Sequence, residues 1–236
     1  MLYFSTYQRP LVEGLILFRH QTAMWNPASP YNHLPGLPPP FRETAKIFRQ
    51  TTRSRVALER LHQKVRLLPE KEIFVQIIPV LEAQASSEIE NIVTTTDNLF
   101  KFLDADTQAD AAAKEALRYR QALWKGMDSL KRCPLSLRTM TAVCSTLRDT
   151  DVSVRKLDGT CIASASSGQV IYTPPAGEAL ILEKLHNLAE FLHSPSEMDP
   201  LVKMAIAHYQ FEAIHPFSDG NGRTGRVLNI LYLVES

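Results

Sequence analysis

Apolar residues recur every three or four positions along most of this chain, the spacing that places them on one face of an α-helix. The pattern predicts helices over residues 43–64, 70–102, 107–127, 136–147, 178–193, 199–214 and 223–233. Ser136 is of a residue type that caps helix N-termini. Core positions are expected in two of these helices, at Leu117, Leu123, Trp124 and Met127 and at Ile181, Leu185, Leu188 and Leu192. The chain is therefore expected to be mainly α.

Residues 152–175 break the helical spacing. Ser164–Gly168 is a run of small residues, and Val170–Thr173 after it has β character before two prolines. This arrangement predicts one small β-hairpin. Further upstream, residues 31–41 are rich in Pro and Gly and predict an extended arm. We expect its leucines and aromatic residues to pack it onto the body, with a polyproline partner-binding segment as the alternative.

The composition changes this picture little. The chain has 236 residues, of which 44% are hydrophobic and 22% charged, as in ordinary globular proteins. A net charge of +1 gives no reason to expect a nucleic-acid or membrane surface. The sequence has no run of eighteen or more apolar residues, so a transmembrane helix is not expected. The three cysteines have no C-x-x-C spacing and are expected to be reduced thiols in a cytoplasmic protein.

The domain organisation follows from these patterns. Residues 1–23 mix charges with apolar residues and make a poor signal peptide, so we expect an extension outside the fold. Residues 24–105 would form an N-terminal arm and helices. Residues 106–236 would form the core that carries the chemistry.

Most of the candidate chemistry lies in one run, residues 215–226 (HPFSDGNGRTGR). Gly220 and Gly222 allow positive φ and close backbone approach, so successive N–H groups can converge on an anion. The helix expected directly afterwards places this turn at a helix N-terminus, which favours phosphate. The run is not a Walker loop, because it has no G-x-x-x-x-G-K-[ST] sequence.

Four side chains of this run have separate chemical uses. Arg223 and Arg226 are three residues apart, so both project to nearly the same side of a helix, and guanidinium groups suit phosphate oxygens. Asp219 can hold Mg²⁺, which prefers one or two carboxylates together with phosphate oxygens. His215 has an ordinary pKa of about 6.5 and can take a proton from an attacking hydroxyl.

The run resembles the signature of the Fic (Fido) family, H-x-F-x-[DE]-G-N-G-R-x-x-R, at every position. The resemblance implies a Fic-type helical bundle with a β-hairpin flap. It also implies transfer of AMP from ATP to a Ser, Thr or Tyr hydroxyl of a target protein, with pyrophosphate leaving. His215 would deprotonate that hydroxyl, Phe217 would anchor the loop, and Asp219 would bind Mg²⁺ on the α- and β-phosphates.

The same resemblance gives the remaining residues of the run a part in binding ATP. Gly220, Asn221 and Gly222 would cradle phosphates, and Arg223 and Arg226 would grip the β/γ end of the nucleotide. The related Doc kinases carry Lys at the position of Gly222, so this chain resembles the AMP-transferring branch.

A second resemblance lies upstream, where residues 86–91 (SSEIEN) fit the inhibitory pattern of the family, [ST]-x-x-x-E-[GN]. Ser86 and Glu90 are four residues apart and share one helical face, and Asn91 follows. The resemblance implies that Glu90 pairs with Arg226 where the γ-phosphate would bind, which inhibits transfer. A glutamate here can also support removal of AMP. Without the resemblance, Glu90 would be a solvated helix carboxylate.

The hairpin supplies a third resemblance. Val170, Ile171, Tyr172 and Thr173 are similar to the flap of the family, which adds an edge strand to the target segment. A plain surface hairpin is the alternative. The expected partners are a target protein with an acceptor hydroxyl and, in a homodimer, a second copy of the chain. Neither a membrane nor a nucleic acid is expected.

Two other functions stay open at this point. His208, Glu212 and His215 could be metal ligands, although their spacing is not the H-E-x-x-H of zinc proteases. The chain could also be a catalytically silent regulatory or binding protein with the same fold. Family members ordinarily continue beyond the helix that here ends near Ser236, so we expect a C-terminal truncation.

Overall fold

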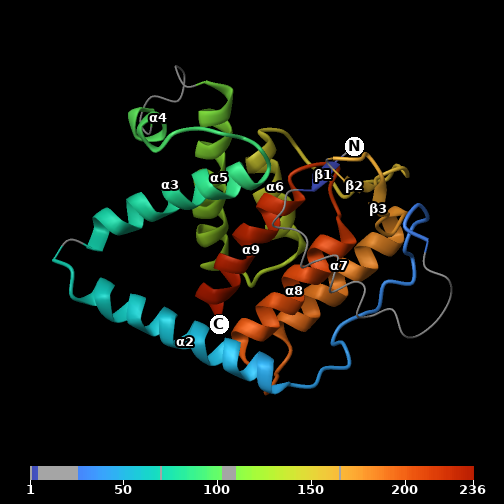
Figure 1. Ribbon diagram of the computed structural model, residues 1–236, viewed down its shortest axis with the longest axis horizontal. Helices are drawn as coiled ribbons and strands as arrows, with labels where there is room; N and C mark the ends of the chain where they lie inside the picture. The colour runs from blue at the N-terminus through green and yellow to red at the C-terminus, as the bar shows by residue number, and fades with distance from the viewer. Residues whose placement is uncertain (1, 5–25, 70, 103–109, 165) are drawn as a thin grey trace.

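The computed structural model describes residues 2–4, 26–69, 71–102, 110–164 and 166–236. Its helices are α2 (Ala45–Arg66), α3 (Lys71–Ile89), α4 (Thr96–Lys101), α5 (Ala111–Leu130), α6 (Leu137–Arg148), α7 (Glu178–His193), α8 (Pro200–Ile214) and α9 (Asn221–Glu235). Its strands are β1 (Leu2–Phe4), β2 (Ile162–Ser164) and β3 (Val170–Tyr172). The predicted mainly α fold with one hairpin is confirmed (Figure 1).

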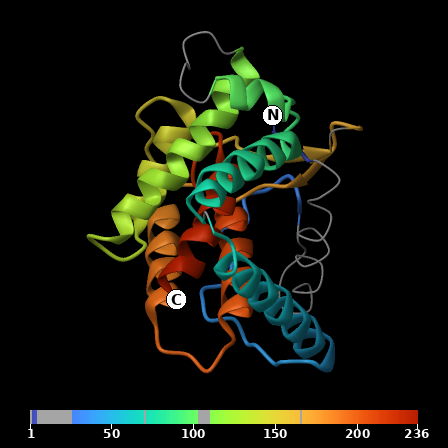
Figure 2. The ribbon, with the colours of Figure 1, turned by 90° about the vertical axis from the view of Figure 1, so that its left-hand side faces the viewer.

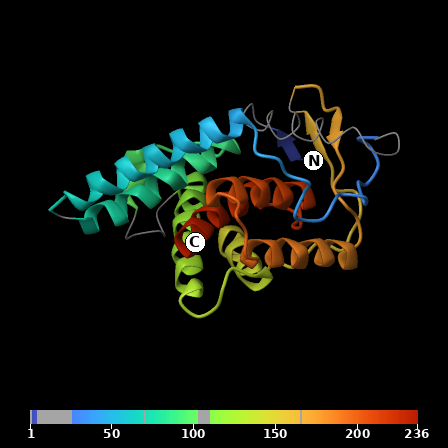
Figure 3. The ribbon, with the colours of Figure 1, turned by 90° about the horizontal axis from the view of Figure 1, so that it is seen from below.

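A helical bundle forms the body of the molecule. Helix α9 packs against α5, α6 and α8, and α7 packs against α8 on the opposite side (Figure 3). The apolar face predicted for α7 is buried in full. In α5, Leu117 and Leu123 are buried as predicted and Met127 is half-buried. Trp124 was expected in the core but is 39% exposed, because Leu123 takes the core position and adjacent helical residues point about 100° apart.

The strands form one small sheet in the order β1-β2-β3. Strand β2 pairs antiparallel with β3, with Ile162 opposite Tyr172, which confirms the predicted hairpin. Strand β1 pairs in parallel with the other edge of β2. Residue 1 and residues 5–23 of the expected extension over 1–23 lie outside the described residues, so that extension stays a prediction.

The Pro-rich arm is packed onto the body, as expected. Leu34 is buried, and its carbonyl accepts a hydrogen bond of 2.6 Å from Nζ of Lys184 on α7. The side chain of Asn187, also on α7, accepts from the Leu37 amide at 2.6 Å and donates to the Leu37 carbonyl at 2.9 Å. This stretch is therefore an anchoring arm.

The predicted helix over 70–102 is broken into α3 and α4. Asn91 has a φ of 63°, in the left-handed region that Asn tolerates better than most residues. Its amide donates to the carbonyl of Glu88 at 2.9 Å, and the Ile92 amide donates to that of Ser87 at 3.0 Å. This pair of bonds is a Schellman motif, which ends α3 and leaves Glu90 at its C-terminal end.

Helix α2 extends away from the bundle and has no buried residue (Figure 2). Arg55 forms an ion pair with Asp199, the residue that caps the N-terminus of α8. None of the helices among the described residues has the length and apolar character needed to cross a membrane.

Candidate active site

The loop between α8 and α9 is closed by one side chain. Asn221 donates from Nδ2 to the carbonyl of Phe217 at 2.8 Å and accepts from the Phe217 amide at 2.9 Å. The ring of Phe217 is fully buried, as expected of an anchor. Because both ends of the Asn221 amide hold the loop, its side chain is committed to the loop backbone, and only its main chain is left for the phosphate cradle expected from the sequence.

The two glycines of this loop serve different purposes. Gly220 is the N-cap of α9 and has a φ of 79°, as expected of a positive-φ position. Gly222 lies inside the first turn of α9 with a negative φ, so the expected positive φ is wrong there. What Gly222 provides is space, because a Cβ at this position would lie 2.6 Å from Oε1 of Glu90.

His215 is buried directly after α8, with a φ of 49°. Among the described residues, neither of its ring nitrogens has a hydrogen-bond partner. Burial, together with the smaller effect of the nearby positive charge of Arg155, lowers the pKa of His215 to about 4. The imidazole is therefore neutral at pH 7, with an unprotonated ring nitrogen that can accept a proton.

Asp219 lies at the surface end of the loop with its carboxylate partly exposed. Its Oδ1 accepts from the Gly220 amide at 2.6 Å, and its Oδ2 forms an ion pair with Arg148 of α6. A half-exposed carboxylate in front of a helix N-terminus fits Mg²⁺, which takes hard oxygen ligands and keeps several of its waters. Arg148 has to release one oxygen for that.

Glu90 lies over the N-terminus of α9. Its Oε1 is 2.9 Å from Nη2 of Arg226 and its Oε2 is 2.7 Å from Nε of Arg223. Ser86 accepts hydrogen bonds from Arg226 through both its hydroxyl and its carbonyl. The expected pairing of Glu90 with Arg226 is therefore present, and Arg223 joins it. A carboxylate occupies the place where the helix dipole and two guanidinium groups favour an anion.

The two arginines differ in their surroundings. The Arg223 side chain is 2% exposed, and its Nη1 is also 2.6 Å from Oε1 of Glu115 on α5. The Arg226 side chain is 17% exposed. Sequence reasoning missed Glu115, Arg148 and Arg155, because each lies more than fifty residues from the residue that it contacts in the 215–226 run, and no local pattern marks it.

Two polar groups lie behind α9, of which Glu212 is buried and His208 is half-buried. His208 and Glu212 of α8 both approach Gly225, where a Cβ would lie 2.5 Å from Oε1 of Glu212 and 3.1 Å from Cε1 of His208. Burial raises the pKa of Glu212 to about 7 and lowers that of His208 to about 4. No group of three His, Cys, Asp or Glu side chains in the described ranges could hold a metal, so the reading of His208, Glu212 and His215 as a metal site is wrong.

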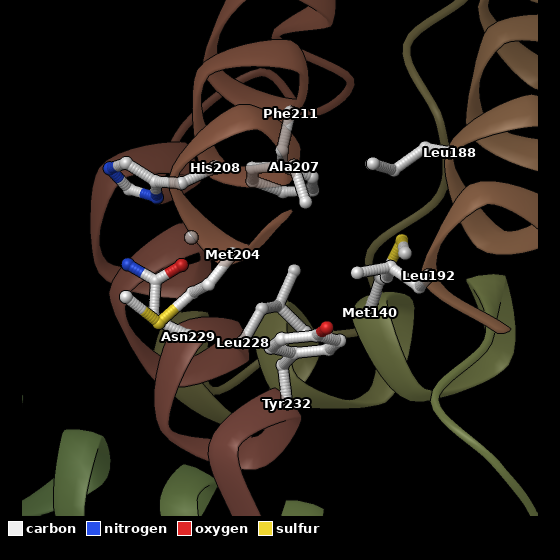
Figure 4. A pocket seen from close by; sticks show the side chains of 11 residues that line it. Met140, Leu188, Leu192, Met204, Ala207, His208, Phe211, Leu228, Asn229 and Tyr232 are labelled. Atoms are coloured by element: carbon white, nitrogen blue, oxygen red, sulfur yellow. The ribbon is translucent and has the colours of Figure 1, made fainter. Parts of the chain in front are cut away.

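A small cavity adjoins His208. His208 and Asn229 line one side of it and Leu188 and Leu192 the other (Figure 4). Its volume is about 20 Å³, which holds about one water molecule. This cavity is too small to hold a nucleotide base.

The hairpin residues fall into two pairs. Val170 and Ile171 are half-buried. The Tyr172 ring is buried, with its hydroxyl donating to the Ala213 carbonyl at 2.8 Å, and the Thr173 hydroxyl donates to the carbonyl of Pro27 at 2.6 Å. The side chains of Tyr172 and Thr173 thus serve the fold, and docking of a target along these four residues stays a prediction.

Comparison with known proteins identifies relatives of this site. The family described as "Fic/DOC family N-terminal" matches residues 48–128, and "Fic/DOC family" matches residues 135–233. Protein adenylyltransferase fic-1 of Caenorhabditis briggsae is 45% identical over 67 residues, which are 28% of this chain and 13% of that protein. A probable protein adenylyltransferase of Aquifex aeolicus is 37% identical over 65 residues, which are 28% of this chain and 20% of that protein.

Two solved structures share the fold. A Fic family protein from Desulfovibrio desulfuricans superposes with a TM-score of 0.61 at 22% identity, over 83% of this chain and 59% of that one. Fic-1 from Caenorhabditis elegans superposes with a TM-score of 0.58 at 18% identity, over 81% of this chain and 58% of that one. Because the two family matches together span most of its length, this chain belongs to the Fic/DOC family.

Proposed function

We propose that this protein transfers AMP from ATP to a Ser, Thr or Tyr hydroxyl of a target protein. One observation carries the proposal: a buried, neutral His215 with unpaired ring nitrogens lies six residues before the start of a helix whose N-terminus already binds an anion. The names of the nematode and Aquifex relatives as protein adenylyltransferases support the same activity.

The chain's own residues account for the steps of the transfer. His215 accepts the proton of the target hydroxyl as its oxygen attacks the α-phosphorus of ATP. The new P–O bond forms as the bond to the leaving oxygen breaks, so the target gains AMP and pyrophosphate departs. Arg226, together with the free amides of the first turn of α9, binds the departing phosphates. Asp219 would hold Mg²⁺, which neutralises phosphate charge when bound.

We further propose that Glu90 inhibits this transfer. Its carboxylate occupies the anion position between Arg223 and Arg226, so the terminal phosphates of ATP have to displace it. The left-handed Asn91 ends α3 directly after Glu90, whose carboxylate contacts both arginines of α9. A carboxylate at this position can also assist removal of AMP from the target by hydrolysis, in which water attacks the phosphorus and the target oxygen leaves. A cytoplasmic location and a homodimer stay predictions.

The test measures the radioactive AMP that becomes attached to protein when α-³²P-ATP and Mg²⁺ are added to the parent and to three variants. His215→Ala abolishes labelling. Glu90→Gly raises it at least about tenfold, because even one of the two charged hydrogen bonds that ATP has to displace is worth about 1.5–3 kcal/mol. Glu88→Gly is the matched control, since Glu88 is exposed on the same helix end and, among the described residues, forms no ion pair with either arginine. It should label like the parent.

Each alternative gives a distinct result. If His215→Ala labels as well as the parent, His215 is not the base. If Glu88→Gly raises labelling as much as Glu90→Gly, loosening of α3 and not loss of the carboxylate is the cause. If ATP with Mg²⁺ raises the melting temperature of every variant and none is labelled, the chain is a silent nucleotide-binding member of the family.

A further inference from the structure

We propose that Arg155 is a positioning residue that caps the C-terminus of α8, holds His215 in its conformation and joins it to the hairpin. The contribution of Arg155 to turnover rests on the proposed function, whereas its contacts and its effect on the imidazole do not.

Arg155 contacts three consecutive carbonyls where α8 runs into the loop. Its amide donates to Pro216 at 2.9 Å, its Nε to His215 at 2.8 Å and its Nη2 to Ile214 at 3.3 Å. The same Nη2 donates to the carbonyl of Pro175, just beyond β3. Ile214 is the last residue of α8 and His215 its C-cap, so their carbonyls have no partners within the helix, and the Arg155 side chain supplies donors to both.

The charge of Arg155 is compensated in an unusual way. The residue is 8% exposed, and no carboxylate of the described residues lies within salt-bridge distance of it. Its guanidinium instead lies at the C-terminus of α8, where the helix dipole carries a partial negative charge. The guanidinium is therefore fixed in position, because moving it would leave both its charge and the carbonyls that it bonds without partners.

This contact acts on the predicted base in two ways. His215 has a positive φ of 49°, which costs a non-glycine residue of order 1–3 kcal/mol unless its surroundings enforce it. The bond from Arg155 to the His215 carbonyl enforces it. The guanidinium also disfavours a protonated imidazole. Two other groups act on the imidazole of His215. The carboxylate of Asp219 and the backbone carbonyl of Glu212 on α8 both favour its protonated form.

A measurement on the unmodified chain tests the geometry. The Nε–H of Arg155 is expected to exchange with solvent at least about a hundredfold more slowly than that of Arg49, which is exposed on α2, because a buried bonded donor exchanges only when the structure opens. Equal exchange rates for the two side chains would overturn the proposal.

Variants then separate positioning from stability. Arg155→Met removes the charge and all side-chain donors, and Arg155→Lys keeps the charge but loses the fork. Lys184→Met is the matched control, since Lys184 is also a buried cation bound to a carbonyl, that of Leu34, on the arm. Arg155→Met and Lys184→Met should both lower the melting temperature.

The pKa of the His215 imidazole and the rate of AMP transfer distinguish the Arg155 variants from Lys184→Met. By NMR, the pKa of His215 rises towards its ordinary value in Arg155→Met and stays low in Arg155→Lys and Lys184→Met. In AMP transfer, both Arg155 variants lose about a hundredfold in kcat with KM for ATP unchanged, as expected for a misplaced base. The acid limb of the pH profile moves to higher pH in Arg155→Met alone.

The two proposals fail separately. An unchanged His215 pKa in Arg155→Met, or Lys184→Met losing as much kcat as Arg155→Lys, contradicts the positioning role. A parent chain that transfers no AMP contradicts the proposed function, and the exchange rate and the pKa still decide the role of Arg155.

Discussion

The carboxylate of Asp219 forms an ion pair with Arg148, and the same carboxylate is the proposed ligand of Mg²⁺. Its Oδ2 pairs with Arg148, and both side chains are more than a third exposed. An exposed pair is worth about 0–1 kcal/mol, so releasing it strengthens metal binding by up to about fivefold. Arg148→Met should therefore lower the Mn²⁺ concentration that half-broadens the Gly220 amide signal in NMR.

The control for this prediction is Arg132→Met. Arg132 also pairs with an aspartate, Asp128, and its loss changes the net charge equally. If both variants bind Mn²⁺ alike, the effect is one of general charge, and Arg148 does not compete for Asp219.

Arg223 and Arg226 should differ in their importance for stability. Arg223 is almost fully buried between Glu90 and Glu115, so Arg223→Met leaves the partly buried Glu115 without its ion pair and Glu90 with Arg226 alone. We expect a loss of about 3 kcal/mol in the free energy of unfolding, against about 1 kcal/mol for Arg226→Met. Urea unfolding measures both. A second change, Glu115→Gln, should recover part of the Arg223→Met loss, and full additivity would argue against the contact.

At the scale of elements, the contact of α8 with α9 depends on Gly225. Alanine in a helix interior is ordinarily more stable than glycine by about 1 kcal/mol. At Gly225, however, a Cβ would lie 2.5 Å from Oε1 of Glu212. Overpacking of this kind costs about 1–3 kcal/mol, so Gly225→Ala should lower the free energy of unfolding. The double variant Gly225→Ala/Glu212→Ala should be less destabilised than the sum of its parts. A more stable Gly225→Ala would contradict the tight contact.

The elements themselves could largely be predicted from the sequence. The buried face of α7 follows from local spacing, because a helix with one apolar stripe has one way to bury it. The end of α3 could not be found this way, since it depends on a left-handed Asn91 within a continuous apolar pattern. Trp124 was misplaced because spacing alone does not decide which of two adjacent apolar residues faces inward.

The candidate site could be predicted only in part. Its loop residues are contiguous, and Glu90 was found through a pattern that puts it on the same helix face as Ser86. Glu115, Arg148 and Arg155 come from α5, α6 and the segment before the hairpin. Their roles arise from packing between elements, which a single sequence does not display.

At the scale of the whole molecule, stability should depend on pH through three groups: His215 and Glu212, which are buried, and His208, which is half-buried. His208 and His215 have folded pKa values of about 4 against an ordinary 6.5, so the unfolded chain binds more protons and their contribution falls as pH drops from 6.5 to 4. Glu212 has a folded pKa of about 7 against 4.5, so the folded chain binds the extra proton and its contribution falls as pH rises from 4.5 to 7. The two effects oppose each other.

Glu212→Gln separates them, because the amide cannot ionise. The free energy of unfolding of the variant minus that of the parent should rise by about 1.4 kcal/mol per pH unit between pH 4.5 and 7, and level off above it. Urea unfolding at half-unit pH steps measures this difference, and the contributions of both histidines cancel in it. A flat difference would mean that Glu212 is already ionised in the folded chain, and therefore that α8 and α9 do not enclose it as tightly as its approach to Gly225 requires.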